Sequence, residues 1–314
     1  MFHQNSFPSE GDNFKTKIEV SIGVCVRNCE KDLRKIVDRI SSQDFPHENM
    51  EVLFVDDGSE DKTLSEILRI APQIGISYRV YHHEWKGLGY SRNVALSNAG
   101  GDYLIWVDDG TIIPRDYVSK HVEFMESNPN VGIARGFIGT YSGSNFVSTL
   151  ENLVRLSFSY KYAGGATTKL PGAAGSVYRI KAARQVGGFQ KDIKGAGEDT
   201  DIAYRILKAG WQIFITTNGF LIDYNTEFKQ VWKKSFWYGY GAHFTIHKHI
   251  EFRDIIYKSS PLGGLIEGVL ASFLAYKTTR KKMAFLLPIW YFMIRIAWNI
   301  GFISSHFDAY GHIQ

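Results

Sequence analysis

Short apolar runs alternate with amphipathic segments through the first two thirds of the chain. The runs that are typical of buried strands lie at 19–26, 50–55, 77–81, 103–107 and 131–136. Apolar residues recur at helical spacing at 32–40, 90–97 and 117–125, and a further helix is expected at 200–209, with Thr200 near its start. Alternation of these two periods predicts βαβ units, and therefore an α/β fold with a mostly parallel sheet flanked by helices.

Acidic residues follow two of these predicted strands directly. The run at 50–55 ends in Asp56 and Asp57, and the run at 103–107 ends in Asp108 and Asp109. A third acidic cluster, at 198–201, follows a glycine-rich loop. Ligands of open α/β sheets bind beyond the carboxyl ends of the strands. The three clusters therefore predict one polar site at that edge of the sheet.

Several short motifs accompany the three acidic clusters. They are SIGVCVRN at 21–28, VDDGS at 55–59, SRN at 91–93, GDYLIWVDD at 101–109, VGGF at 186–189, GEDTD at 197–201 and KAGW at 208–211. In this order they resemble the motifs of family 2 glycosyltransferases, over roughly residues 19–211. The resemblance implies a GT-A fold and inverting transfer of a sugar from a nucleotide-sugar donor. A UDP-sugar is expected more than a GDP-sugar.

The resemblance also assigns roles to individual residues. Asp199 is expected to be the general base that takes a proton from the acceptor hydroxyl. Donor contacts are expected from Val26, Arg27, Asp57, Lys86, Arg92 and Asp108. The sugar or acceptor side is expected to include Gly172, Gly175, Glu198 and Trp237. Alternatively, the acids at 56–57 form a turn and those at 198–201 stabilise the start of a helix.

A divalent cation is the expected cofactor, but one residue departs from the family pattern. Hard oxygen ligands suit Mg²⁺ or Mn²⁺, which would bridge the diphosphate oxygens beside Asp108 and Asp109. Gly110 stands where the family has the second Asp of its DxD motif. Either Asp109 takes over the cation, or Lys86 and Arg92 carry more of the charge of the leaving group.

The chain is expected to comprise a flexible lead-in at 1–16, a catalytic domain at 17–225 and a helical, basic region at 226–314. That last region carries 11 basic residues against 5 acidic ones, and it holds apolar segments at 260–276 and 283–304. In the second segment Tyr291, Arg295 and Asn299 form a polar stripe, which suits an interfacial helix or a span whose stripe faces protein. The basic connector at 277–282 favours a first segment that lies on the cytosolic leaflet.

These features predict an enzyme on the cytoplasmic face of a membrane, peripheral, monotopic or with one span. Its acceptor would be a hydroxyl or a lipid phosphate. A soluble domain in which both segments are core helices is the alternative. The lead-in lacks the apolar core of a secretory signal, and no nucleic-acid-binding module is indicated. The chain also lacks the QxxRW motif of processive synthases, so a single addition is favoured.

The remaining candidate ligands indicate no transition-metal site. Cys25 and Cys29 have no second pair and are expected to be reduced, buried thiols. His243, His247 and His249 have no carboxylate at zincin spacing and are interpreted as a polar helix face or an acceptor-side wall. The rival functions are a nucleotidyltransferase, for which no glycine-rich phosphate loop follows the first strand, and a nucleotide-sugar-binding protein without turnover, which Gly110 favours.

Overall fold

The computed structural model describes residues 17–139, 145–159, 163–193, 196–222, 227–253, 256 and 259–308. The chain forms two compact units. The first comprises Met1–Phe137, Ala163–Asp192 and Glu198–Ile222, and the second comprises Ile138–Tyr162, Ile193–Gly197 and Asp223–Gln314. The second unit therefore takes in segments from the middle of the chain that the sequence had assigned to the catalytic domain.

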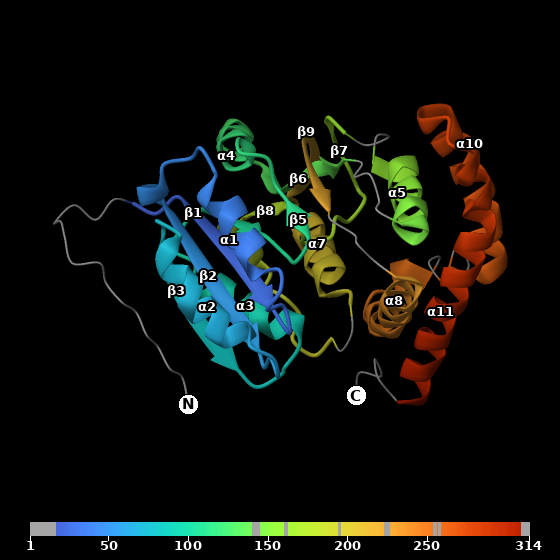
Figure 1. Ribbon diagram of the computed structural model, residues 1–314, viewed down its shortest axis with the longest axis horizontal. Coiled ribbons are helices and arrows are strands. Elements are labelled where there is room, and N and C mark those ends of the chain that lie inside the picture. The colour runs from blue at the N-terminus through green and yellow to red at the C-terminus, as the bar shows by residue number, and fades with distance from the viewer. Residues whose placement is uncertain are drawn as a thin grey trace. The chain divides into compact units, whose positions relative to one another are not determined.

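A nine-stranded mixed sheet organises the first unit (Figure 1). Its parallel part has the order β3-β2-β1-β4, formed by Ser77–His83, Met50–Asp57, Val20–Val26 and Tyr103–Trp106. From β4 the sheet continues through β8 (Ser176–Arg179), β6 (Val131–Ile138), β9 (Gln212–Ile222) and β5 (Thr111–Ile112), with β7 (Gly165–Ala166) also on β9. Pairing of β8 with β4 and β6 is antiparallel. The predicted parallel arrangement thus describes one part of the sheet.

The helices of the first unit are α1 (Leu33–Ser41), α2 (Thr63–Ile70), α3 (Leu88–Asn98), α4 (Tyr117–Ser127), α6 (Ile180–Gln185) and α7 (Glu198–Lys208). Four of them, α1, α3, α4 and α7, match the predicted helical segments, whereas α2 and α6 were not predicted. Helix α1 buries Leu33, Ile36, Val37 and Ile40, the residues at helical spacing. Helix α7 begins two residues before the predicted start, so that Glu198 and Asp199 form its first turn.

The central strands of the first unit are buried in its core. Every residue of β1 and β2 is buried, as expected for parallel strands covered on both faces. Trp106 fills the space beside Gly23, where a Cβ atom would lie 2.4 Å from its ring, and its ring meets Phe189 edge-on. Cys25 and Cys29 are free and buried, as predicted. Burial raises the pKa of the Cys29 thiol to about 12.

In the part of the second unit that the structure describes, the helices are α5 (Phe146–Ser159), α8 (Phe228–Lys248), α10 (Pro261–Thr279) and α11 (Leu287–Phe307). Short 3-10 turns at Ile250–Arg253 and Lys282–Leu286 connect them. Helix α11 packs against both α8 and α10. A Cβ atom on Gly239 of α8 would lie 1.8 Å from the Trp298 carbonyl oxygen, and one on Gly268 of α10 would lie 2.5 Å from Pro288. The helices therefore pack with their backbones in close contact.

The polar stripe of α11 faces protein. The Arg295 guanidinium donates to Glu267 of α10 at 2.8 Å, and the Asn299 amide donates to the Ser259 carbonyl at 2.8 Å. Tyr291 is buried. Among the described residues, one helical stretch, Lys282–Phe307, is long and apolar enough to cross a membrane, with a mean hydropathy of 1.5 and 33% of its most apolar window buried.

We expect Gly136→Ala to lower the free energy of unfolding by about 1–3 kcal/mol, which a urea titration would measure. A Cβ atom at Gly136 would lie 2.0 Å from the Asn218 carbonyl oxygen of the neighbouring strand, and backbone cannot move aside cheaply. Gly165→Ala is the matched control, because no atom lies within 4 Å of its added Cβ. Equal midpoints for the two variants would contradict this account of the packing.

Candidate active site

The two carboxylates at the end of β2 have different partners. Asp56 is fully buried, and its oxygens accept hydrogen bonds from the Ser59 hydroxyl and, at 2.7 Å, contact Nδ1 of His82. Asp57 accepts from the backbone N–H groups of Lys86, at 2.8 Å, and Gly87, at 3.1 Å. Asp56 therefore closes its own turn, and Asp57 fixes the loop that leads into α3.

Two histidines at this edge were missed by the sequence analysis. The predicted third strand ended at residue 81, but β3 continues to His83 and pairs Asp56 with His82 and Asp57 with His83. Nδ1 of His83 lies 3.5 Å from the Asp57 carboxylate. The consecutive histidines directly after an apolar run were the available signal, because parallel neighbours end at the same edge.

Arg92 joins the second and third acidic clusters. Its side chain is 2% exposed, on α3, and it donates to Asp108 beyond β4 at 3.0 Å and to Glu198 at the start of α7. Burial lowers the pKa of the guanidinium, but the carboxylates of Asp108 and Glu198 outweigh burial and raise it above its usual value. Asp199 adds to this rise, so all three acids lie within electrostatic reach of one cation.

Asp199 is held in a fixed orientation at the first turn of α7. Its Oδ1 accepts from the Thr200 N–H at 2.7 Å, and its Oδ2 accepts from the Ala173 N–H at 3.2 Å. A Cβ atom on Gly172 would lie 3.3 Å from the same Oδ2, so the small-residue loop lies against this carboxylate. Asp199 remains partly exposed. It is therefore an oriented carboxylate that a ligand can reach.

Asp201, two residues further on, has a structural role. It is fully buried, and its Oδ2 accepts from Nε of Arg205 at 2.8 Å. Arg205 also donates to the carbonyl oxygens of Val186 and Gly188. This ion pair ties the VGGF segment to α7.

The metal-binding candidates are Asp108 and Asp109. Asp109 reaches solvent, while Asp108 is already paired with Arg92. Desolvation raises the pKa of the Asp109 carboxyl, the neighbouring carboxylates of Asp32 and Asp108 raise it further, and the Gly110 N–H and Lys35 oppose the rise. A carboxyl surrounded by other acids favours a cation. The residues present therefore fit a divalent cation held mainly by Asp109, with Gly110 contributing no carboxylate.

The other predicted donor residues lie on two neighbouring strand-end loops. Val26 is buried and pairs with Asp56. Arg27 is exposed, donates to Glu60 at 2.9 Å and lies 5.3 Å from the ring centre of Trp85. Trp85 is 55% exposed and was not singled out from the sequence. Such an exposed ring beside an arginine can stack on a nucleobase.

The remaining predicted residues are divided between the two units. Lys86 is exposed, with Nζ 4.5 Å from the ring centre of Tyr90. Gly175, at φ 68°, leaves room for the Phe220 ring, which an added Cβ would meet at 2.6 Å. Gly175 therefore shapes the loop that carries Gly172. Trp237 lies on α8 in the second unit, and its position beside an acceptor stays a prediction.

The chain is similar in sequence to curated proteins over part of its length. It is 26% identical over 213 residues to the succinoglycan biosynthesis protein ExoA of Rhizobium meliloti (strain 1021), covering 64% of this chain and 62% of the relative. It is 28% identical over 111 residues to the poly(ribitol-phosphate) beta-N-acetylglucosaminyltransferase TarS of Staphylococcus aureus (strain Mu50 / ATCC 700699), covering 35% of this chain and 19% of the relative. The chain thus spans about three fifths of ExoA and about one fifth of TarS.

Solved structures show the same fold. The mannosyltransferase PcManGT from Pyrobaculum calidifontis, in complex with GDP-Man and Mn²⁺, superposes with a TM-score of 0.65 at 19% identity, over 92% of this chain and 87% of that one. Residues 1–349 of S. aureus TarS, in complex with UDP-GlcNAc, give a TM-score of 0.54 at 15% identity, over 93% and 92%. These likenesses confirm the predicted GT-A fold.

A family model matches residues 21–187, which include the Asp56–Asp57 and Asp108–Asp109 pairs and the Arg92 that joins two of the acidic clusters. That segment is more than half of the chain. The chain belongs to glycosyl transferase family 2.

Proposed function

We propose that this glycosyltransferase inverts the anomeric centre in a single addition, with Asp199 as the general base. The observation that carries the proposal is the orientation of Asp199. Its carboxylate is partly exposed, fixed by the N–H groups of Thr200 and Ala173, and lies against the Gly172 loop. A base fixed in this way can accept a proton without first reorienting.

The proposed reaction is a direct displacement of the diphosphate at the anomeric carbon. The acceptor hydroxyl gives its proton to the Asp199 carboxylate while its oxygen forms the new bond to the anomeric carbon. The bond from that carbon to the diphosphate oxygen breaks, and the nucleoside diphosphate leaves with the electron pair. Attack from the face opposite the leaving group inverts the configuration. Arg92 does not transfer a proton in this scheme; it positions Asp108 and Glu198.

The donor is proposed to bind along the ends of β1 and β2. Asp57 shapes the start of α3 through Lys86 and Gly87, and the exposed Trp85 and Arg27 offer a surface for the base. A UDP-sugar is proposed, because TarS was solved with UDP-GlcNAc, although PcManGT was solved with GDP-Man. A divalent cation at Asp109, when bound, would neutralise the diphosphate charge.

The second unit is proposed to rest on the cytosolic leaflet of an anionic membrane. Helix α10 turns its small residues inward and its large apolar residues outward: Leu262, Ile266, Val269, Leu270, Phe273 and Leu274 are 42–70% exposed. Close packing through small residues, with large apolar side chains outside, is typical of helices in lipid. The basic residues at 280–282 follow α10 and would attract anionic headgroups. A lipid-linked acceptor would then be within the reach of this surface.

We expect Asp199→Asn to lower kcat by at least about 10²-fold while the Kd for the donor changes by no more than a few-fold, because a base acts in the transition state. Release of nucleoside diphosphate and isothermal calorimetry would measure the two quantities. Asp192→Asn, at an exposed acid of the same unit, is the control. Unchanged turnover in Asp199→Asn would remove this residue from the mechanism.

Chelation with EDTA is expected to abolish transfer, and Mn²⁺ or Mg²⁺ to restore it. Asp109→Asn should raise the half-saturating Mn²⁺ concentration by about tenfold or more, because it removes the exposed carboxylate of the site. Asp102→Asn, at an exposed acid paired with Lys17, should leave that concentration unchanged. Full activity in chelator would instead assign neutralisation of the leaving group to basic side chains.

The double variant Leu270→Glu and Phe273→Glu should shift the protein from sedimenting with phosphatidylserine-containing vesicles to the supernatant. The side chains are 69% and 63% exposed, so the charges disturb the lipid contact rather than the core. Leu68→Glu, at a residue 51% exposed on α2, is the matched control. Equal sedimentation of all three proteins would show that this face does not bind membrane.

A further inference from the structure

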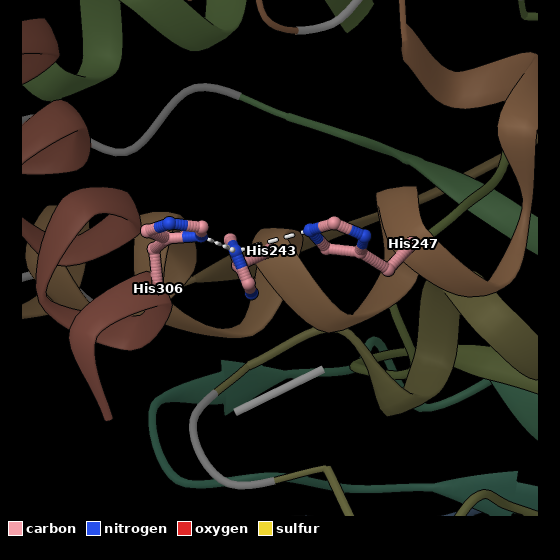
Figure 2. Close-up of side chains that lie close together, drawn as sticks. All are labelled: His243, His247 and His306. Atoms are coloured by element: carbon pink, nitrogen blue, oxygen red, sulfur yellow. Dashed lines mark hydrogen bonds between the residues drawn. The ribbon is translucent and has the colours of Figure 1, made fainter. Parts of the chain in front are cut away.

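Three histidine side chains of the second unit lie next to one another, with the His243 ring between those of His247 and His306 (Figure 2). His243 and His247 lie one turn apart on α8, and His306 lies near the end of α11. Nε2 of His243 is 3.1 Å from Nε2 of His247 and 3.2 Å from Nδ1 of His306. One possible ligand atom from each of the three rings lies within 4.8 Å of the others.

The sequence analysis considered a different set of three histidines as ligands and did not favour it. His243, His247 and His249 are close in the sequence, and the absence of a carboxylate at zincin spacing spoke against a metal. In the structure the third ring comes instead from His306, which is 63 residues away from His243. The packing of α11 on α8 brings it there, since Gly239 and Gly301 let the two backbones approach. Phe302 packs on the His243 ring with ring centres 4.9 Å apart.

The two short contacts are hard to satisfy with hydrogen bonds alone. Nε2 of His243 carries either one proton or one lone pair, and it faces a nitrogen atom on each side. As a donor, this nitrogen atom forms a good hydrogen bond to only one of its two neighbours. As an acceptor, it likewise takes a good hydrogen bond from only one of them. A cation placed between the rings can instead accept a lone pair from all three nitrogens at the same time.

Two of the three distances match those of a tetrahedral ion. Zn–N bonds of about 2.0–2.1 Å place neighbouring ligand atoms about 3.3 Å apart. Two of the separations, 3.1 and 3.2 Å, are close to that edge, and the atoms of the third pair lie within 4.8 Å of each other. His247 and His306 are exposed, so small rotations of their side chains can close the third edge and an ion can reach the site. His243 is buried and fixes the position of the site.

We propose that His243, His247 and His306 bind one Zn²⁺ ion, with water in the fourth position. The ion would join α8 to the end of α11 and so stabilise the second unit. Its nitrogen ligands set it apart from the oxygen ligands that Mg²⁺ or Mn²⁺ would find at Asp109. The site therefore takes a different class of metal from the one that supports sugar transfer.

The test uses the full chain, purified without a histidine tag and stripped of metal by dialysis. Equilibrium dialysis with Zn²⁺ should give one tightly bound ion per chain, and Co²⁺ should give the intense visible absorption of a tetrahedral site. Each of His247→Gln and His306→Gln should weaken Zn²⁺ binding by at least about tenfold, and the double variant should lose the Co²⁺ signal. Zn²⁺ should also raise the Tm of the parent protein more than that of the double variant.

Two further variants serve as controls for the Zn²⁺-binding measurements. His249→Gln changes the neighbouring histidine that lies outside the cluster, and Asp109→Asn changes the predicted Mn²⁺ ligand; both should bind Zn²⁺ as the parent protein does. Because His247 and His306 are exposed, their variants should fold, which circular dichroism would check. Absence of stoichiometric Zn²⁺ binding, or binding that survives in the folded double variant, would overturn the proposal.

Discussion

The arrangement of the acidic clusters in the first unit depends on one buried, positively charged side chain, that of Arg92. Arg92 is almost inaccessible to solvent, and a buried guanidinium is tolerated only when carboxylates pair with it. It finds them in Asp108, beyond β4, and in Glu198, at the first turn of α7. Three segments, of which that of Glu198 lies 106 residues from Arg92 in the sequence, are therefore fixed to one another at the carboxyl edge of the sheet. Asp199, next to Glu198, takes its position from this arrangement.

The acids of this edge divide into carboxylates enclosed by protein groups and carboxylates that stay accessible. Asp56 and Asp201 are fully buried. Asp56 contacts the side chains of Ser59 and His82, and Asp201 accepts a hydrogen bond from Arg205. Asp109 and Asp199 remain accessible beside them. Because the supporting pairs fix the loops on either side, the accessible carboxylates can face a ligand without the cost of ordering them first. Rigid support next to reachable oxygen atoms is what proton transfer and cation binding both require.

The second unit is organised by close backbone contacts between helices. Glycines on α8, α10 and α11 have no side chain that would separate the helices. The interfaces are therefore formed by backbone in close contact rather than by large apolar side chains. Two consequences follow. Large apolar residues of α10 are left on the outside, where lipid can cover them, and His306 is brought against His243. The proposed membrane surface and the proposed nitrogen-ligand metal site would both follow from this packing.

Much of the catalytic unit could be predicted from the sequence. The strands that lead to Asp57 and Asp109, the helix of Asp199 and the free thiols were recognised, because hydrophobic periodicity and local motifs specify them over a few residues. The family followed from the order of those motifs. Tertiary structure alone decided the antiparallel part of the sheet, the length of β3 and the pairing of Arg92, since each requires partners distant in the sequence. The meeting of His243 with His306 and the outward face of α10 depend likewise on which helices pack together, which periodicity within one helix cannot determine.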